Sequence, residues 1–452
     1  MKRYRVILLV LLLSAAAAAA PRNVVIMICD GCGYNHVDAA DLYEKGKTGE
    51  QAYEDFPVKL AVATCPAGGS YDPEKAWQDP DYIKQNPTDS AAAATAMATG
   101  HKTGKGRIGV DAQDMPLLNL IERFEALGRS TGLVTSVQIS HATPAGFAAH
   151  NGDRDDYAQI AREMIQQTAL DVIMGCGHPW YDRQGRLVSG DADFRYVGGE
   201  PTWRQLIAGA AGSDADGDGD EDPWTLIENR LDFQRMSAVS TTKRVLGVAK
   251  IRKTLQQERP GDHNAAAFAV PFIETVPTLE EMTLAALNIL DEDDDGFFLM
   301  VEGGAVDWAC HDNQKGRMIE EMSAFNRAAE AVIKYVGRQT AGWDHTLIIV
   351  TSDHETGYLC GPPTVPCVGH PMREIIENKG PGRMPGMEFK SDDHTNSLVP
   401  LYAKGSGAGR FLKAVRGTDP VRGPYIDNTD VADVITDLLR KEAVKEEVGG
   451  RR

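Results

Sequence analysis

Short apolar runs alternate with longer amphipathic stretches along much of the chain. Three short runs are apolar throughout, at 24–28, 297–301 and 347–350, and a fourth at 133–139 is mainly apolar; all four predict fully buried strands. Four stretches carry apolar residues at helical spacing and predict helices, at 115–127, 157–168, 279–290 and 318–336. Strands that alternate with helices are typical of a parallel sheet covered on both faces. We therefore predict an α/β fold with a large central, mostly parallel β-sheet, helices on both faces and inserted loop regions.

Two regions interrupt the alternation. Residues 176–260 have mixed composition and include an acidic run at 214–222, and residues 357–390 are rich in Gly and Pro. Long stretches without clear periodicity are usually functional rims or disordered segments. The length of 452 residues allows two or three domains. The pattern is equally consistent with one domain over 21–452 that carries insertions at about 176–260 and 357–390, and we predict this arrangement.

The first twenty residues have the features of an export signal. Lys2, Arg3 and Arg5 precede an apolar run at 6–13, and small residues follow at 15–20. The apolar run is too short to span a bilayer comfortably, and no second long apolar segment is present. We therefore expect a cleaved signal peptide (1–20), a periplasmic or secreted protein and no membrane anchor.

The chain is acidic, with 65 Asp and Glu against 47 Lys and Arg and a formal net charge of -18. Such a protein is a poor candidate for nucleic-acid binding, which depends on neutralising phosphates with Lys and Arg. If the substrate is an anion such as a phosphate ester, the positive charge must be local, from metal ions or a placed Arg.

Seven cysteines occur after the export signal, so at least one cannot pair within the chain. Cys360 and Cys367 flank a Pro-rich loop and are the best candidates for a disulfide. Cys29 and Cys32 form a C-x-x-C motif, but a second such motif is lacking in the sequence. We interpret these two residues as small buried hydrophobic side chains rather than a redox or zinc motif.

Metal-competent side chains follow each of the four predicted strands. They are Asp30; His141 and Thr143; Glu302, Asp307 and His311; and Asp353 and His354. His394 precedes a further apolar segment. The carboxyl ends of parallel strands meet at one edge of a sheet, where ligands bind. Mixed carboxylates and imidazoles suit zinc, whereas oxygen ligands suit magnesium, so the set predicts a metal centre although each residue alone is weak evidence.

A candidate nucleophile lies in the segment Pro-Thr-Asp-Ser-Ala-Ala-Ala-Ala at 87–94. The Ala-rich sequence is a strong helix former, so Asp89 or Ser90 could simply be a helix N-cap. A helix N-terminus also favours an alkoxide and a bound phosphate. Because the sequence lacks a G-x-S-x-G motif, activation of Ser90 by a metal fits better than activation by a base.

Taken together, these blocks resemble the alkaline phosphatase family. The matching segments are Asp30-Gly, Asp89-Ser90-Ala, His141-Ala-Thr143-Pro, Arg154, Glu302-Gly-Gly-Ala-Val-Asp307-Trp-Ala-Cys-His311, Thr-Ser-Asp353-His354-Glu-Thr-Gly and His394-Thr. They occur in the family's order between about residues 22 and 405. The resemblance implies phosphate monoester hydrolysis through a phosphoserine on Ser90, with broad tolerance for the alcohol, and a homodimer.

The resemblance also implies two zinc ions and one magnesium ion. One zinc would be held by Asp307, His311 and His394, and the other by Asp353, His354 and Asp30. Asp30 would bridge to magnesium, with Glu302 and Thr143 completing that site. Arg154 would bind the phosphate and Asp89 would orient it. His141 and Trp308 occupy positions that vary in the family, so His141 could bind magnesium directly or through water, and Trp308 removes a possible phosphate-binding cation.

Other functions stay open at this point. A phosphodiesterase or sulfatase of the same superfamily is the closest alternative, although a sulfatase C/S-x-P-x-R motif is absent from the sequence. A secreted metal- or calcium-binding protein without enzymatic activity is the second, because the run 214–222 resembles the start of an EF-hand loop. Its twelfth position is Thr225 instead of Glu, which favours a solvated acidic loop.

Overall fold

The computed structural model describes residues 20–79, 81–238, 244–362 and 375–449, with side chains up to residue 440. The predicted export signal, apart from Ala20, lies outside the described residues, and so does Cys367. The signal peptide and the disulfide between Cys360 and Cys367 therefore stay predictions.

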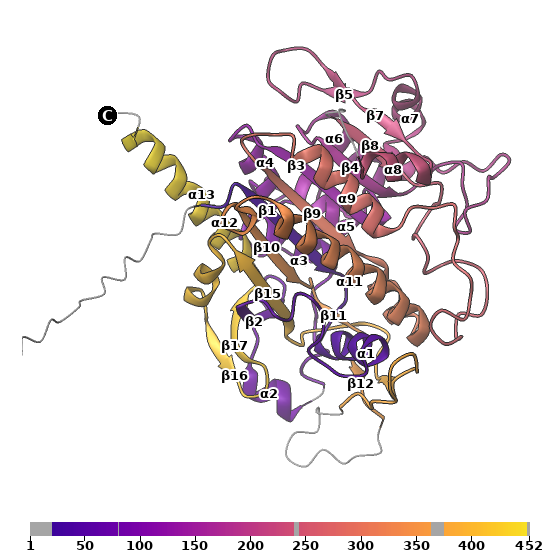
Figure 1. The fold of residues 1–452 in the computed structure, drawn as a ribbon, viewed down its shortest axis with the longest axis vertical. Helices are drawn as coiled ribbons and strands as arrows, with labels where there is room; N and C mark the ends of the chain where they lie inside the picture. The colour runs from indigo at the N-terminus through magenta and orange to yellow at the C-terminus, as the bar shows by residue number, and fades with distance from the viewer. Residues whose placement is uncertain (1–19, 80, 239–243, 363–374, 450–452) are drawn as a thin grey trace, which may run out of the picture.

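A large mixed sheet forms the centre of the molecule (Figure 1). Its strands lie in the order β16 (Gly417–Asp419), β17 (Gly423–Asp427), β2 (Val58–Ala63), β15 (Val399–Gly405), β10 (Thr346–Thr351), β1 (Asn23–Cys29), β9 (Phe297–Gly303), β3 (Ser130–Gln138), β4 (Val172–Cys176), β8 (Val245–Val248) and β7 (Thr225–Ile227). All neighbours from β10 to β7 pair in parallel. β15 pairs antiparallel with both β10 and β2. The predicted mostly parallel sheet is confirmed.

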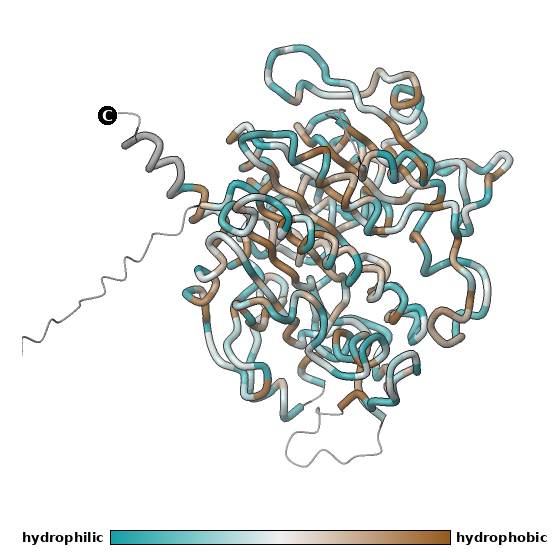
Figure 2. The backbone as a smooth tube through the Cα atoms, viewed as in Figure 1, coloured by the Kyte–Doolittle hydropathy of each residue, from teal (hydrophilic) through white to brown (hydrophobic). Residues whose placement is uncertain are grey.

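The four predicted strands correspond to β1, β3, β9 and β10. These strands are neighbours, in the order β10, β1, β9, β3, and every residue of β9 and β10 is buried. The continuous apolar sequence of β1, β9 and β10 follows from this position, because strands of a parallel sheet are covered on both faces. Tube colouring by hydropathy shows the apolar character of the central strands (Figure 2).

Helices cover both faces of the sheet, and alternate residues of β1 belong to two separate cores. Val24, Ile26 and Ile28 face one core, whereas Val25 and Met27 face the other. The first core is closed by α3 (Ser90–Thr99), α4 (Leu120–Glu125), α5 (Ala142–Ala148), α6 (Tyr157–Gln166), α7 (Glu200–Ile207) and α13 (Thr429–Gly449). The second is closed by α1 (Tyr34–Glu44), α8 (Arg230–Met236), α9 (Leu279–Leu290), α10 (Ala305–His311) and α11 (Lys315–Arg338).

Three of the four predicted helices are confirmed as α6, α9 and α11. The fourth, predicted at 115–127, is wrong at its start because α4 spans only Leu120–Glu125. Asn119 caps α4, and its side chain accepts a hydrogen bond from the Glu122 amide while Glu122 bonds back to the Asn119 amide. This capping box fixes the helix start, because the cap residue itself has an extended backbone.

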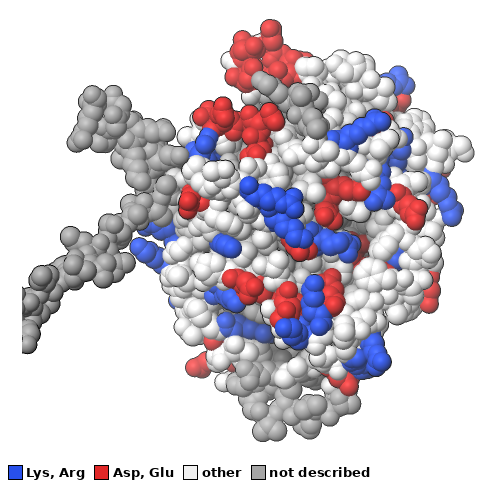
Figure 3. All heavy atoms as spheres, in the orientation of Figure 1, with Lys and Arg blue, Asp and Glu red and all other residues white. Residues whose placement is uncertain are grey.

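The region 176–260 adds β7 and β8 to one edge of the sheet and includes a small hairpin. That hairpin, β5 (Gly212–Ser213) and β6 (Asp222–Pro223), carries the acidic run 214–222 between its strands. In Figure 3 acidic side chains gather at the top of the molecule, where Figure 1 places β5. Across the described residues, none of the helices combines the length and the apolar character that a membrane span needs.

Candidate active site

Four neighbouring strands place the predicted metal ligands at one edge of the sheet. Along the order β10, β1, β9 and β3, the residues at or just after the strand ends are Asp353 and His354, Asp30, Glu302, and His141. Thr143 follows in α5, and Asp307 and His311 follow in α10. Because parallel strands all end at this edge, residues more than 300 positions apart come within contact distance.

The His354 imidazole lies at the centre of one group. Its Nε2 atom is 3.1 Å from Asp353 Oδ2, 3.5 Å from Asp30 Oδ1 and 3.2 Å from the Ser90 hydroxyl. All four side chains are at most 2% exposed. A metal ion placed between these side chains could therefore contact two carboxylates, an imidazole and the hydroxyl of the candidate nucleophile.

Ser90 is the first residue of α3, and Asp89 is the N-cap of that helix. Asp89 Oδ1 accepts a hydrogen bond from the Ala92 amide (3.1 Å), while Oδ2 accepts from the Gly106 amide (3.0 Å) and from Arg154 Nη1 (2.9 Å). The helix start therefore fixes both the serine and the guanidinium. Every residue of α3 is buried, and its small alanines allow α5 to pack closely, where a Cβ on Gly146 would lie 2.7 Å from Ala94 Cβ.

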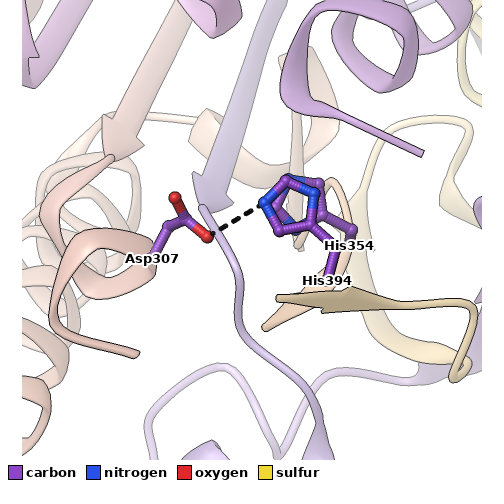
Figure 4. A group of neighbouring side chains, drawn as sticks. All are labelled: Asp307, His354 and His394. Atoms are coloured by element: carbon purple, nitrogen blue, oxygen red, sulfur yellow. Dashed lines mark ion pairs between the residues drawn. The ribbon is translucent and has the colours of Figure 1, made fainter. Parts of the chain in front are cut away.

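A second group consists of Asp307, His311 and His394. Asp307 Oδ1 is 3.4 Å from His311 Nε2 and 3.5 Å from His394 Nε2, and the two Nε2 atoms are 3.0 Å apart. His394 lies in the short strand β14 (His394–Thr395), which pairs antiparallel with β11 (Glu355–Thr356). This pairing stacks the His394 ring on that of His354 at 3.7 Å (Figure 4). The two groups are thus adjacent.

A third group lies on the other side of Asp30. One ligand atom each from Asp30, His141 and Glu302 lie within 4.8 Å of one another. The Thr143 hydroxyl is buried here without a hydrogen-bond partner among the described residues. The Thr135 hydroxyl donates to Glu302 from the adjacent strand, where Thr135 and Glu302 are direct register partners.

These carboxylates are costly to bury as anions. Burial, followed by the charges of Asp353, Asp307 and Glu302, raises the pKa of Asp30 well above its usual value. Burial is also the largest cause that raises the pKa of Glu302 to about 7 and that of Asp353 to about 6. Asp30 Oδ1 and Oδ2, Glu302 Oε1 and Asp353 Oδ2 are buried without hydrogen-bond partners among the described residues. Divalent cations would satisfy these oxygens and offset their repulsion, so the residues fit a metal centre.

The imidazoles differ in charge state. Burial lowers the pKa of His354 well below its usual value, and burial together with the Arg154 charge lowers the pKa of His141 to about 3. Burial opposes protonation of His394 too, but its hydrogen bond to Asp307 raises its pKa to about 9. His141 and His354 are therefore neutral imidazoles near pH 7, which is the form that binds metal ions.

Two of the polar residues that support the site were not among the sequence-based candidates. The Thr135 hydroxyl contacts Glu302, and the Thr356 hydroxyl donates to Asp307 Oδ1 at 2.6 Å. Thr135 was not singled out by the sequence, because the same strand also contains Ser136 and Gln138. The sequence did not single out Thr356 either, because its role depends on the pairing of β11 with β14.

The side chains of the two remaining sequence motifs do not belong to the three groups. Cys29 and Cys32 are buried against Met322, with sulfur–sulfur distances of 3.4 and 3.6 Å, and burial raises the pKa of Cys29 well above its usual value. A thiolate is therefore disfavoured at Cys29. Asp214, Asp216 and Asp218 are exposed, and their carboxylates accept hydrogen bonds from amides of their own loop.

Comparisons with known proteins show which family and fold this chain resembles. The family model described as "Alkaline phosphatase" matches residues 21–382. Alkaline phosphatase 4 of Bacillus subtilis is 28% identical over 93% of this chain and 89% of its own length. Streptomycin-6-phosphate phosphatase of Streptomyces griseus is 28% identical over 92% of this chain and 90% of its own. The solved alkaline phosphatase of the Antarctic bacterium TAB5 superposes with a TM-score of 0.63 at 22% identity, covering 94% of this chain and 99% of that one.

Proposed function

Because the chain belongs to the alkaline phosphatase family, we propose that it hydrolyses phosphate monoesters to an alcohol and inorganic phosphate through a phosphoserine on Ser90. The observation that carries the proposal is the position of the Ser90 hydroxyl, 3.2 Å from His354 Nε2 at the edge of the carboxylate cluster. A serine at a helix start without catalytic function would not need two buried carboxylates and an imidazole beside it.

We propose that the three groups hold two zinc ions and one magnesium ion. Asp307, His311 and His394 would bind one zinc, and Asp353, His354 and Asp30 the other, which suits the mixture of nitrogen and oxygen ligands. Asp30, Glu302 and Thr143 would bind magnesium through oxygen, with His141 at the same site directly or through water. When bound, such cations lower the pKa of coordinated hydroxyl groups and neutralise the charge on the entering and leaving oxygens.

The protein's own residues position the reaction. The helix start of α3 holds the Ser90 oxygen where the helix dipole favours an alkoxide, and the Ser90 oxygen attacks phosphorus as the bond to the alcohol oxygen breaks. Arg154 can bind two phosphate oxygens at once because its guanidinium is planar, and Asp89 keeps that guanidinium beside Ser90. Water then hydrolyses the phosphoserine and frees the serine.

The site recognises the phosphoryl group and leaves the alcohol largely unspecified, so we expect broad tolerance for the alcohol. One relative is named for a single substrate, streptomycin 6-phosphate, and turnover of a panel of monoesters measures the breadth of this chain. We also propose that the enzyme is exported after cleavage of segment 1–20 and works as a homodimer.

A phosphodiesterase of the same superfamily is the second candidate function. It is disfavoured because Glu302 and Thr143, the proposed magnesium ligands, both lie in the third group with unpartnered buried oxygens. The ratio of p-nitrophenyl phosphate to bis-p-nitrophenyl phosphate hydrolysis separates the two functions. A ratio above one supports the monoesterase, and a ratio below one supports the diesterase.

Metal analysis together with p-nitrophenyl phosphate turnover tests the proposal. We expect the purified protein to contain zinc and magnesium, to lose activity with a chelator, and to regain full activity only when both metals return. Ser90→Ala should retain the metals and lose turnover. Full activity of the chelated protein, or of Ser90→Ala, would exclude the mechanism.

A further inference from the structure

A lysine from the inserted region projects into the same pocket as the candidate nucleophile. The pocket has a volume of about 480 Å³, and its lining includes Ser90, His141, Arg154, Lys253 and Trp308. Lys253 lies in the segment that follows β8, far from the family motifs in sequence.

The backbone on both sides of Lys253 is anchored to the sheet. The Ile251 carbonyl accepts hydrogen bonds from the Gly177 and His178 amides at 3.2 and 3.1 Å. On the other side, the Leu255 amide donates to the Ser136 carbonyl at 3.0 Å. Both anchors lie next to the ends of β4 and β3, so Lys253 is held at the edge of the sheet where the metal groups lie.

The Lys253 side chain lies over an aromatic side chain of the pocket. Its Nζ atom is 5.2 Å from the centre of the Trp308 ring, a cation–π distance, and that ring is 5.7 Å from His141. The charge is only weakly paired, because the Glu258 carboxylate lies 4.0 Å from Nζ and is also 3.4 Å from Arg183. The side chain is 29% exposed and lines the pocket.

Lys253 adds a positive charge to a pocket that Arg154 and Lys105 also line. A phosphate monoester carries close to two negative charges near pH 7, whereas a diester carries one. The net charge of the chain is -18, and the Arg154 charge is shared with Asp89 at 2.9 Å. Lys253 offers a flexible four-carbon stem and three N–H donors within the same pocket.

We propose that Lys253 is a substrate-binding residue whose ammonium contacts the phosphoryl oxygens and selects dianionic phosphate monoesters over monoanionic diesters. This inference rests on the proposed phosphatase function. The inserted region would then supply the phosphate-binding cation that the aromatic residue at position 308 does not provide.

The test compares Lys253→Met with Lys250→Met in the full chain, in buffer containing zinc and magnesium salts. Methionine keeps the unbranched apolar stem over Trp308 and removes the charge. Lys250 is the control because it lies in the same segment but bonds Asn229 Oδ1 at 2.7 Å and lies over Tyr181, outside the pocket lining. Two quantities are measured for each variant: the ratio of kcat/KM for p-nitrophenyl phosphate to that for bis-p-nitrophenyl phosphate, and the calorimetric Kd for inorganic phosphate.

We expect Lys253→Met to lower the monoester to diester ratio about tenfold and to weaken phosphate binding by a similar factor, as for the loss of one charge-assisted hydrogen bond. Lys253→Arg should recover most of both, and Lys250→Met should match the wild type. Equal ratios and equal phosphate affinities in Lys253→Met and Lys250→Met would overturn the inference. If the wild type lacks monoesterase activity, the proposed function fails, and the calorimetric comparison still decides whether Lys253 binds phosphate.

Discussion

Individual residues of the site serve the fold and the chemistry together. The sequence around Ser90 was equally consistent with a helix cap and with a nucleophile. In the structure Asp89 is the cap, Ser90 is the first helical residue, and the hydroxyl of Ser90 points to His354. Asp89 also holds Arg154, so its two oxygens link helix stability to phosphate binding.

Replacement of Asp89 should therefore destabilise the protein. Asp89→Ala removes the acceptor for the Ala92 and Gly106 amides and the ion pair with Arg154, and we expect a loss of about 1–2 kcal/mol in the free energy of unfolding. Urea denaturation measures this change. Asp89→Asn keeps a capping oxygen and should lose less. Equal losses in the two variants would show that the cap contributes little.

The raised pKa of Glu302 predicts that the stability of the chelated protein depends on pH. The Glu302 pKa is raised from 4.5 to about 7, so in the chelated protein its stabilising contribution is complete below pH 4.5 and is lost as pH rises through 7. Glu302→Gln cannot ionise. Between pH 4.5 and 8 the chelated variant should gain stability relative to chelated wild type, up to the order of 3 kcal/mol.

With magnesium bound, the wild type should be more stable than Glu302→Gln, because only the glutamate offers a charged ligand. Thermal unfolding at several pH values, with chelator and with magnesium, measures both effects. A pH-independent difference between Glu302→Gln and wild type would contradict the assignment of Glu302 as a buried ionisable ligand.

At the scale of elements, sequence pattern succeeded where burial is uniform. Continuous apolar runs identified β1, β9 and β10, and a mainly apolar run identified β3, because strands covered on both faces have no exposed side. The start of α4 was misplaced, because apolar spacing continues upstream of the Asn119 cap. The two-residue strands β11 and β14 have no periodicity to detect, yet their pairing places His394 and Thr356 in the site.

The turn after β1 depends on glycine. Gly31 has φ +75°, and a Cβ there would lie 2.9 Å from the Asp307 Cα and from the Thr356 hydroxyl oxygen. Gly49 has φ +83° with nothing within 4 Å of an added Cβ. Gly49→Ala should cost about 1 kcal/mol from backbone strain alone. Gly31→Ala should cost clearly more and should weaken metal binding, because Asp30 is displaced.

Chemical denaturation and zinc titration of both variants measure these effects. Equal destabilisation of Gly31→Ala and Gly49→Ala would mean that the close approach of the turn to α10 is not important for stability.

At the scale of the whole molecule, the site exists because four strands that are separate in sequence are neighbours in the sheet. The sequence predicted that strand ends carry metal ligands, and the family resemblance predicted which residues belong together. The strand order β10, β1, β9, β3 and the antiparallel β15 depend on long-range pairing that periodicity does not report. The position of Lys253 likewise depends on hydrogen bonds to β3 and to the residues after β4.

The phosphoserine is the central claim, and trapping it tests the claim most directly. The metal-loaded enzyme is incubated with radiolabelled phosphate, quenched with acid and digested, and the labelled peptide is identified. The account predicts one labelled residue, Ser90, and no label on Ser90→Ala under the same conditions. Label that persists on Ser90→Ala, or that maps to another residue of the wild type, would contradict the account.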